Sequence, residues 1–237
     1  MRRRCGWTKR GSLDYAFVVR YEVVTFDCYG TLIDWEDGIT RAFRETAGRD
    51  GVRLDDAAVL AAYAEIEPAI EARGYRSYRE VLGACVVEVG ARLGFRVAAD
   101  RAGFLAESLA GWRPFPDTVP ALERLAAAGY ALGILSNVDD DLFAATRRAL
   151  RVEFSIVVTA EQVRSYKPAP GHFLEARRRI GGRLWLHAAR SRFHDVEPAS
   201  ALDIDAAWIR RGSARAAVPA GVEVFDDLAR LADRLSA

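Results

Sequence analysis

The stretch Glu22-Val23-Val24-Thr25-Phe26-Asp27-Cys28-Tyr29-Gly30-Thr31-Leu32 decides the fold. Residues 22–26 are rich in β-branched and aromatic side chains, which predicts a short strand, and turn chemistry follows Asp27 at Gly30 and Thr31. Open α/β sheets present reactive groups in this way, because ligands bind beyond the carboxyl ends of parallel strands. The sequence therefore predicts that Asp27 lies at the functional edge of a sheet.

Downstream of Pro116, short apolar runs alternate with stretches of helical periodicity. The pattern predicts helices over 118–128, 140–150, 171–180 and 198–202, and strands over 131–135, 155–159, 184–188 and 206–209. Strands that alternate with helices form right-handed βαβ units. We therefore expect an α/β protein with a doubly wound parallel sheet.

Residues 38–111 have a different sequence pattern, with apolar residues at helical spacing over 57–66 and 81–93. Breaks between helices are expected at Pro68 and Gly74. This all-helical block interrupts the α/β pattern after its first strand. We expect it to be a second, smaller domain that lies over the carboxyl edge of the sheet.

The remaining segments complete the predicted domain organisation. Residues 21–37 and 112–237 would form the α/β core, and residues 1–20 a basic N-terminal extension that the fold does not need.

Composition excludes several classes of function. The 237 residues are 51% hydrophobic and 28% charged, which is typical of a globular protein. The 34 basic and 33 acidic residues nearly cancel, and the basic cluster is confined to the N-terminus, so we expect no nucleic-acid partner. No apolar run approaches the roughly 18–20 residues that span a bilayer. Three widely spaced cysteines without metal-ligand spacing favour a reducing compartment, and we expect a cytoplasmic protein with no membrane partner.

Four groups of polar residues each fall at the predicted carboxyl end of a strand: 27–32, Ser136-Asn137, Lys167-Pro168 and 191–195. Each group alone has an ordinary explanation as a turn former, a helix cap or a solvated charge. Their occurrence together on one sheet edge favours a functional site.

The order of these groups, DCYGTL, SN, YKP and then Ser…Asp, resembles the four motifs of the haloacid dehalogenase superfamily. The similarity extends over residues 22 to 212 and is strongest toward the 2-haloacid dehalogenase branch. The resemblance implies a Rossmann-like core with an inserted α-helical cap. It also implies that Asp27 is the nucleophile of a covalent hydrolytic cycle.

The resemblance assigns roles to the other motif residues. Lys167 would neutralise charge beside Asp27 and keep the pKa of that carboxyl low. Asp195 would orient Lys167 or a water, with His194 as a candidate base for the water step, whereas His187 lies within a predicted strand and is interpreted as a packed core histidine. The complete assignment is catalysis by Asp27, Lys167, Ser136 and Asp195, and substrate binding by Tyr29, Thr31, Asn137, Arg190, Ser191 and His194.

Two positions separate the reaction classes of this superfamily. Phosphatases carry a second Asp two residues after the nucleophile to protonate the leaving alkoxide, and this chain has Tyr29 there, as 2-haloacid dehalogenases do. Phosphatases also bind Mg²⁺ through an Asp that corresponds to Arg190 here, and a guanidinium repels a cation. Both positions favour metal-independent displacement of halide from a small 2-halocarboxylate, with no cofactor. Mg²⁺ is expected only if the protein is a phosphatase.

The chain also departs from the dehalogenase pattern. The cap arginine of those enzymes has no counterpart near residues 63–65, with Arg73, Arg76 and Arg79 as candidate substitutes. The family's tyrosine and asparagine fall on Phe173 and Arg192. These departures leave two alternatives open, namely a phosphatase acting on a small phosphoester and a catalytically decayed small-molecule-binding protein. The natural substrate, its stereochemistry and the formation of a homodimer also stay open.

Overall fold

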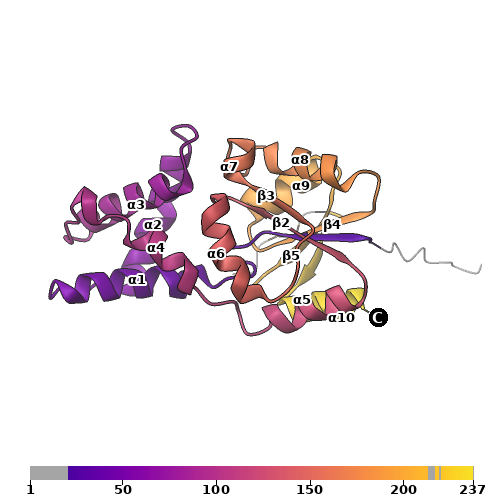
Figure 1. The fold of residues 1–237 in the computed structure, drawn as a ribbon, viewed down its shortest axis with the longest axis horizontal. Helices are drawn as coiled ribbons and strands as arrows, with labels where there is room; N and C mark the ends of the chain where they lie inside the picture. The colour runs from indigo at the N-terminus through magenta and orange to yellow at the C-terminus, as the bar shows by residue number, and fades with distance from the viewer. Residues whose placement is uncertain (1–20, 213–216, 219, 237) are drawn as a thin grey trace, which may run out of the picture.

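Six parallel strands form the central sheet of the protein, in the order β3-β2-β1-β4-β5-β6 (Figure 1). The computed structural model describes residues 21–212, 217–218 and 220–236, so the predicted extension over residues 1–20 lies outside the described residues. The strands are β1 (Val23–Phe26), β2 (Ala131–Ser136), β3 (Ile156–Thr159), β4 (Trp185–Ala189), β5 (Asp205–Ile209) and β6 (Glu223–Phe225). The strand order places β1 next to both β2 and β4, so the carboxyl end of β1 lies in the middle of the sheet edge.

Helices cover both faces of the sheet, which is why its strands read as short apolar runs without alternation. On one face α5 (Thr118–Ala127) packs against α10 (Leu228–Leu235) and α6 (Asp140–Leu150). On the other face α8 (Gly171–Ile180) contacts β2 and β3, and α9 (Glu197–Ala201) contacts β5. All four residues of β1 are buried as a result.

The doubly wound parallel sheet predicted from the sequence is confirmed. Each of the five predicted strands is present within one or two residues of its expected bounds. Two elements near the C-terminus were not predicted, because β6 has three residues and α10 has eight, too few for a clear period. The short helix α7 (Ala160–Val163) was also missed.

The segment between β1 and α5 is helical throughout and lies beyond the carboxyl ends of the strands (Figure 1). It contains α1 (Trp35–Arg49), α2 (Asp56–Glu71), α3 (Tyr78–Arg92), α4 (Phe104–Ser108) and the 3₁₀ turns at Ala99–Arg101 and Leu109–Gly111. Side chains cap the three long helices. Asp55 accepts from the Ala58 amide at 2.8 Å, and Ser77 and Glu80 form a reciprocal capping box at the start of α3.

The expected break at Pro68 is wrong, because Pro68 lies inside α2. A proline removes one amide donor from a helix, yet Ile66 and Ile70 are both buried on the same face, and their packing holds the helix together on either side of Pro68. The helix therefore continues to Glu71, and the break falls at Gly74 as expected.

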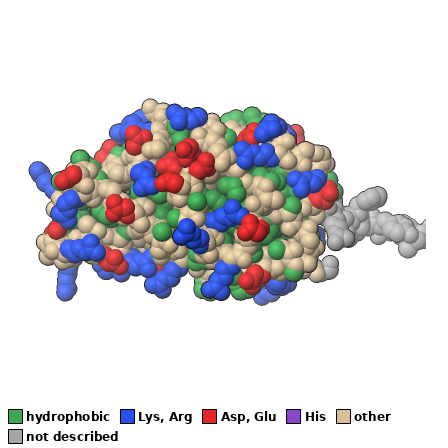
Figure 2. Space-filling model, viewed as in Figure 1, with side chains coloured by type: hydrophobic (Ala, Val, Ile, Leu, Met, Phe, Trp, Pro, Cys, Tyr) green, Lys and Arg blue, Asp and Glu red, His purple; other side chains and the backbone are tan. Residues whose placement is uncertain are grey.

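The side chains of β1 alternate between two hydrophobic clusters. Val24 and Phe26 belong to the cluster that includes α5 and α10, and Val23 belongs to the cluster beneath α8. Cys28 is fully buried in the first of these clusters. The face of the molecule shown in Figure 2 intersperses basic and acidic side chains, and none of the helices in the described part is long and apolar enough to cross a bilayer.

Candidate active site

A cavity of about 320 Å³ lies between the carboxyl edge of the sheet and the helical segment. Nine of the ten residues that the sequence assigned to the site line it. The lining from the sheet side comprises Asp27, Tyr29, Gly30, Ser136, Asn137, Lys167, Arg190, Ser191, His194 and Asp195. The lining from the helical side comprises Trp35, Ile39, Tyr63, Glu67, Glu71, Tyr78 and Trp112. A cavity of this size suits a small organic molecule.

Asp27 follows β1 directly, and the turn after it holds its carboxylate in place. The Thr31 hydroxyl donates to Asp27 Oδ2 at 2.8 Å. The chain reverses at Gly30, whose amide donates to the Ile33 carbonyl at 2.7 Å and whose φ of 95° favours glycine. A Cβ at this position would also lie 2.9 Å from the Trp35 indole nitrogen, so both the turn and the cavity wall require glycine.

Lys167 is buried next to Asp27 and uses all three of its ammonium donors. The donors reach Asp27 Oδ1 at 2.9 Å, the Leu135 carbonyl at 2.8 Å and Asp195 Oδ1 at 2.5 Å. The prediction that Lys167 follows a strand directly is wrong, because the helix α7 lies between β3 and this residue. The fully satisfied ammonium group fixes two carboxylates relative to each other.

The expectation of a low pKa for Asp27 is wrong in direction. Burial raises the pKa of Asp27 above the usual carboxyl range, and the nearby charge of Asp195 adds to this effect. Lys167 and the Thr31 hydroxyl favour the charged form but do not outweigh the burial. A buried carboxylate with few water contacts is a stronger nucleophile than a solvated one, provided that it is ionised.

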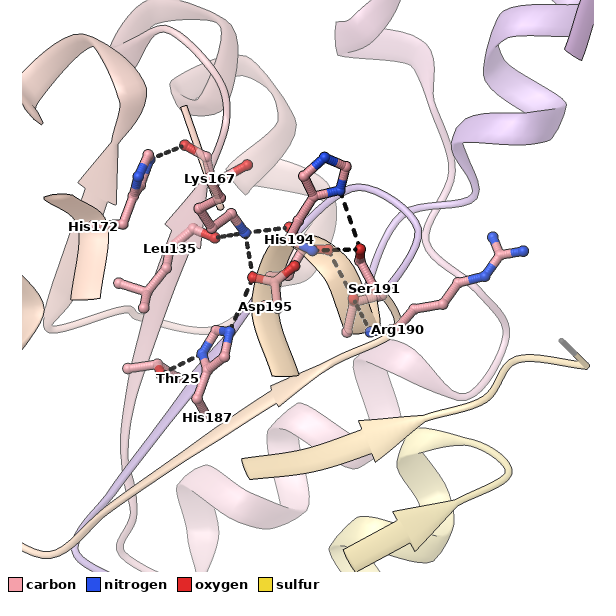
Figure 3. Close-up of polar contacts among 12 residues, drawn as sticks. Thr25, Leu135, Lys167, His172, His187, Arg190, Ser191, His194 and Asp195 are labelled. Atoms are coloured by element: carbon pink, nitrogen blue, oxygen red, sulfur yellow. Dashed lines mark hydrogen bonds and ion pairs between the residues drawn. The ribbon is translucent and has the colours of Figure 1, made fainter. Parts of the chain in front are cut away.

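Asp195 is also buried, but its charged form is favoured. Burial raises the pKa of Asp195, and Lys167 and His187 more than offset this effect, so that the pKa falls to about 2. His187 Nε2 lies 3.1 Å from Asp195 Oδ1, and His187 Nδ1 lies 2.9 Å from Thr25 Oγ1 (Figure 3). His187 is thus a buried, hydrogen-bonded residue of β4, as predicted, and Asp195 is positioned to orient Lys167.

Ser136 and Asn137 contribute differently. The Ser136 hydroxyl is buried, lines the cavity and has no hydrogen-bond partner among the residues that the structure describes. Asn137 instead holds the Lys167 backbone, accepting from its amide at 2.7 Å and donating to its carbonyl at 3.1 Å. His172, which the sequence analysis missed, lies with Nε2 at 3.1 Å from the Ser136 carbonyl oxygen, and burial lowers its pKa to about 3. Ser136 is therefore the hydroxyl left available to a ligand.

Arg190 and Thr31 connect the fourth motif to the first. The Arg190 amide donates to the Thr31 hydroxyl at 2.9 Å, while its guanidinium forms an ion pair with Glu36 at 2.8 Å. Thr31 itself does not line the cavity, so it acts through Asp27 rather than on a ligand. Arg190 thus supplies a positive charge to the cavity wall.

Ser191, His194 and Tyr29 complete the sheet side. Ser191 Oγ accepts from the His194 amide at 3.0 Å and lies 3.1 Å from His194 Nδ1. The chain has three histidines, and His194 is the one that lines the cavity. The Tyr29 hydroxyl lies 2.8 Å from Thr146 Oγ1, and its ring packs edge-on against Trp112.

The helical side of the cavity presents two carboxyl groups, whereas the dehalogenase pattern has an arginine on the cap. Glu67 accepts from the hydroxyls of Tyr63 and Tyr78 at 2.7 and 2.6 Å. Glu71 lies one helical turn further along α2. A single acidic residue on an amphipathic helix is an ordinary surface feature, so only the packing of α2 over the sheet edge could reveal these two.

The candidate arginines do not take part in this wall. Arg73 and Arg79 form exposed ion pairs with Glu88 and Asp141, and neither lines the cavity. Arg76 does not line it either.

The residues around Asp27 are a poor fit for Mg²⁺. Asp27 and Asp195 both bind the Lys167 ammonium, and Arg190 adds a positive charge to the same wall. Within residues 21–212, 217–218 and 220–236, no group of three or more His, Cys, Asp or Glu side chains is placed to hold a metal ion. Hard cations prefer several oxygen ligands, which this arrangement does not supply.

The parallel sheet, the helical segment and the cavity between them define an α/β protein with a site for a small molecule. The family model for haloacid dehalogenase-like hydrolases matches residues 21–196. The chain belongs to this family.

Individual relatives point to two chemistries. The chain is 25% identical to (S)-2-haloacid dehalogenase 4A of Burkholderia cepacia over 161 residues, 66% of this chain and 68% of that protein. It is 28% identical to the phosphoglycolate phosphatase of Rhodospirillum rubrum over 224 residues, 90% of each. Among solved structures, a defluorinating L-2-haloacid dehalogenase superposes with a TM-score of 0.80 at 22% identity, over 92% of this chain and 96% of that one. At that identity the superposition establishes the fold alone.

Proposed function

We propose that the protein is a metal-independent hydrolase in which Asp27 displaces halide from a small 2-halocarboxylate. One observation carries the proposal: Asp27 lines the cavity with one oxygen bound by Lys167 and the other by Thr31, and Tyr29 and Arg190 line the same cavity. The sequence similarity to a 2-haloacid dehalogenase supports the same chemistry.

The proposed reaction has two steps. An oxygen of Asp27 forms a bond to C2 of the substrate while the carbon–halogen bond breaks, and the electron pair leaves with the halide. Water then attacks the carbonyl carbon of the Asp27 ester, which releases the 2-hydroxy acid and restores the carboxylate. Asp195 positions Lys167 throughout, since its low pKa makes it a poor proton acceptor. His194 is the candidate base for the water step because it lines the cavity.

The substrate carboxylate needs donors and positive charge on the sheet side. Ser136 offers an unpaired hydroxyl, and Arg190 offers a guanidinium in the same cavity. Both are compatible with a small anion held beside Asp27.

Ser136→Ala isolates the contribution of this hydroxyl to binding. Because the hydroxyl has no partner in the described part of the chain, its removal should leave the free energy of unfolding within about 0.5 kcal/mol of wild type. The KM for 2-bromopropionate should rise roughly tenfold, as expected for one lost hydrogen bond to a charged group. Steady-state kinetics and urea unfolding check both values, with exposed Ser200→Ala as the matched control. A large loss of stability with unchanged KM would contradict this role.

Metal dependence tests the proposal directly. We expect halide release to be unchanged in excess EDTA and unchanged again on addition of Mg²⁺, because the residues around Asp27 fit a metal ion poorly. The measurement is initial rate with wild-type protein before and after exhaustive chelation. Activity that disappears with EDTA and returns with Mg²⁺ would overturn this part of the proposal.

A small-phosphoester phosphatase is the second candidate, and the 28% identity to phosphoglycolate phosphatase over 90% of both chains favours it. In that reaction Arg190 would offset the phosphate charge. The absence of a second acid at Tyr29 weighs against it, since a leaving alkoxide needs a proton. Release of phosphate from phosphoglycolate at a rate above halide release would make this the better assignment.

A further inference from the structure

The helical wall of the cavity carries a carboxyl group that none of the described residues binds. Glu67 accepts from two tyrosine hydroxyls, whereas Glu71 forms no hydrogen bond or ion pair with the described residues. Glu71 is partly buried and lines the same cavity as Asp27 and the Ser136 hydroxyl, which is 1% exposed and has no partner among the described residues. A ligand that contacts Ser136 and Asp27 on the sheet side thus faces Glu71 on the helical side.

The direction in which the leaving group departs brings it close to the helical wall of the cavity. An in-line attack by Asp27 drives the leaving group away from the sheet and toward the helical segment. Two ionised carboxylates there would repel a departing anion by several kcal/mol at low effective dielectric. A carboxyl group that keeps its proton would instead donate a hydrogen bond to that anion.

We propose that Glu71 is a catalytic hydrogen-bond donor to the departing halide, and that it extends the reaction to fluoride, the halide that accepts hydrogen bonds most strongly. This inference rests on the proposed function. The Glu71 proton stays on its oxygen during the step. The Asp27–C2 bond forms, the carbon–fluorine bond breaks, and the fluoride accepts the hydrogen bond as its charge develops.

The surroundings of Glu71 keep it protonated at neutral pH. Burial, followed by the charge of Glu67, raises the pKa of Glu71 to about 9, and Lys167 opposes this rise. Donation is therefore complete below that pH and is lost as the pH rises through it. The titratable or charged groups around Glu71 are Tyr63 and Glu67 of α2, Tyr78 and Cys85 of α3, and Tyr166 and Lys167 of the segment after α7.

Two variants test the proposal through substrates that differ only in leaving group, 2-fluoropropionate and 2-bromopropionate. Glu71→Leu removes the donor, so fluoride release should fall about 10- to 100-fold more than bromide release. Glu71→Gln keeps a donor that does not titrate, so it should retain fluoride release and lose the wild-type decline above about pH 9. Glu65→Leu, at an exposed position of the same helix, is the matched control.

The outcomes separate this inference from the proposed function. Equal losses of fluoride and bromide release in Glu71→Leu, or an alkaline decline that persists in Glu71→Gln, would overturn the role of Glu71 while leaving Asp27 as the nucleophile. No halide release from either substrate by wild-type protein would overturn the proposed function and the inference with it.

Discussion

Asp27→Asn should lower halide release by about 10³-fold or more, because an amide cannot attack C2 or form the ester intermediate. The substitution keeps the shape of the side chain, and its carbonyl oxygen can still accept from Thr31 or Lys167. We therefore expect a folded protein that still binds substrate. The measurement is single-turnover halide release, together with thermal unfolding with and without 2-bromopropionate.

Asp100→Asn is the matched control, because Asp100 is exposed and lies away from the cavity. It should behave as wild type. Turnover by Asp27→Asn at a rate close to that of wild type would remove Asp27 as the nucleophile and with it the proposed mechanism.

Lys167→Met should have the second large effect, on both stability and activity. The ammonium lies between two buried carboxylates, at 2.9 Å from Asp27 and 2.5 Å from Asp195. Without it these charges are uncompensated, and removing one partner of such a buried group costs about 3–5 kcal/mol. Urea unfolding at neutral pH measures this loss. Halide release should fall below detection, because Asp27 loses the group that orients it.

The pH dependence of the Lys167→Met defect distinguishes charge from packing. Protonation of the uncompensated carboxylates relieves their repulsion, so the difference in unfolding free energy from wild type should shrink as the pH falls from 7 to 5. Arg96→Met removes an exposed positive charge and should show neither effect. A deficit that stays constant with pH would indicate that lost packing, not charge, is responsible.

The sheet and most of the nucleophilic site were predictable because their signals are local. A short run of β-branched and aromatic residues such as Val23–Phe26, which is buried on both faces, is readily predicted to be a strand. Asp27 follows this strand directly. Lys167 also stands out in composition, since it is one of two lysines among the 34 basic residues. That Lys167 lies beside Asp27 could be inferred only through the family resemblance, because the helix α7 separates Lys167 from the strand β3.

The helical side of the cavity was not predictable, because it depends on how α2 packs over the sheet edge. Glu67 and Glu71 lie one turn apart on α2, a helix that contains Pro68. Because a break was expected at Pro68, the sequence did not predict that these two residues share one helix face. The net pKa shift of Asp27 was missed for a related reason. Burial depends on the whole surrounding structure, and it outweighs the charge of Lys167 that the motif reveals.

The central claim is that Asp27 forms an ester whose carbonyl carbon is attacked by water. A single turnover in oxygen-18 water with enzyme in excess over 2-bromopropionate tests it most directly. The account predicts unlabelled lactate and one heavy oxygen in the peptide that contains Asp27, read by mass spectrometry. Lactate that carries the label, with an unlabelled Asp27 peptide, would show that water attacks the substrate directly and would contradict the account.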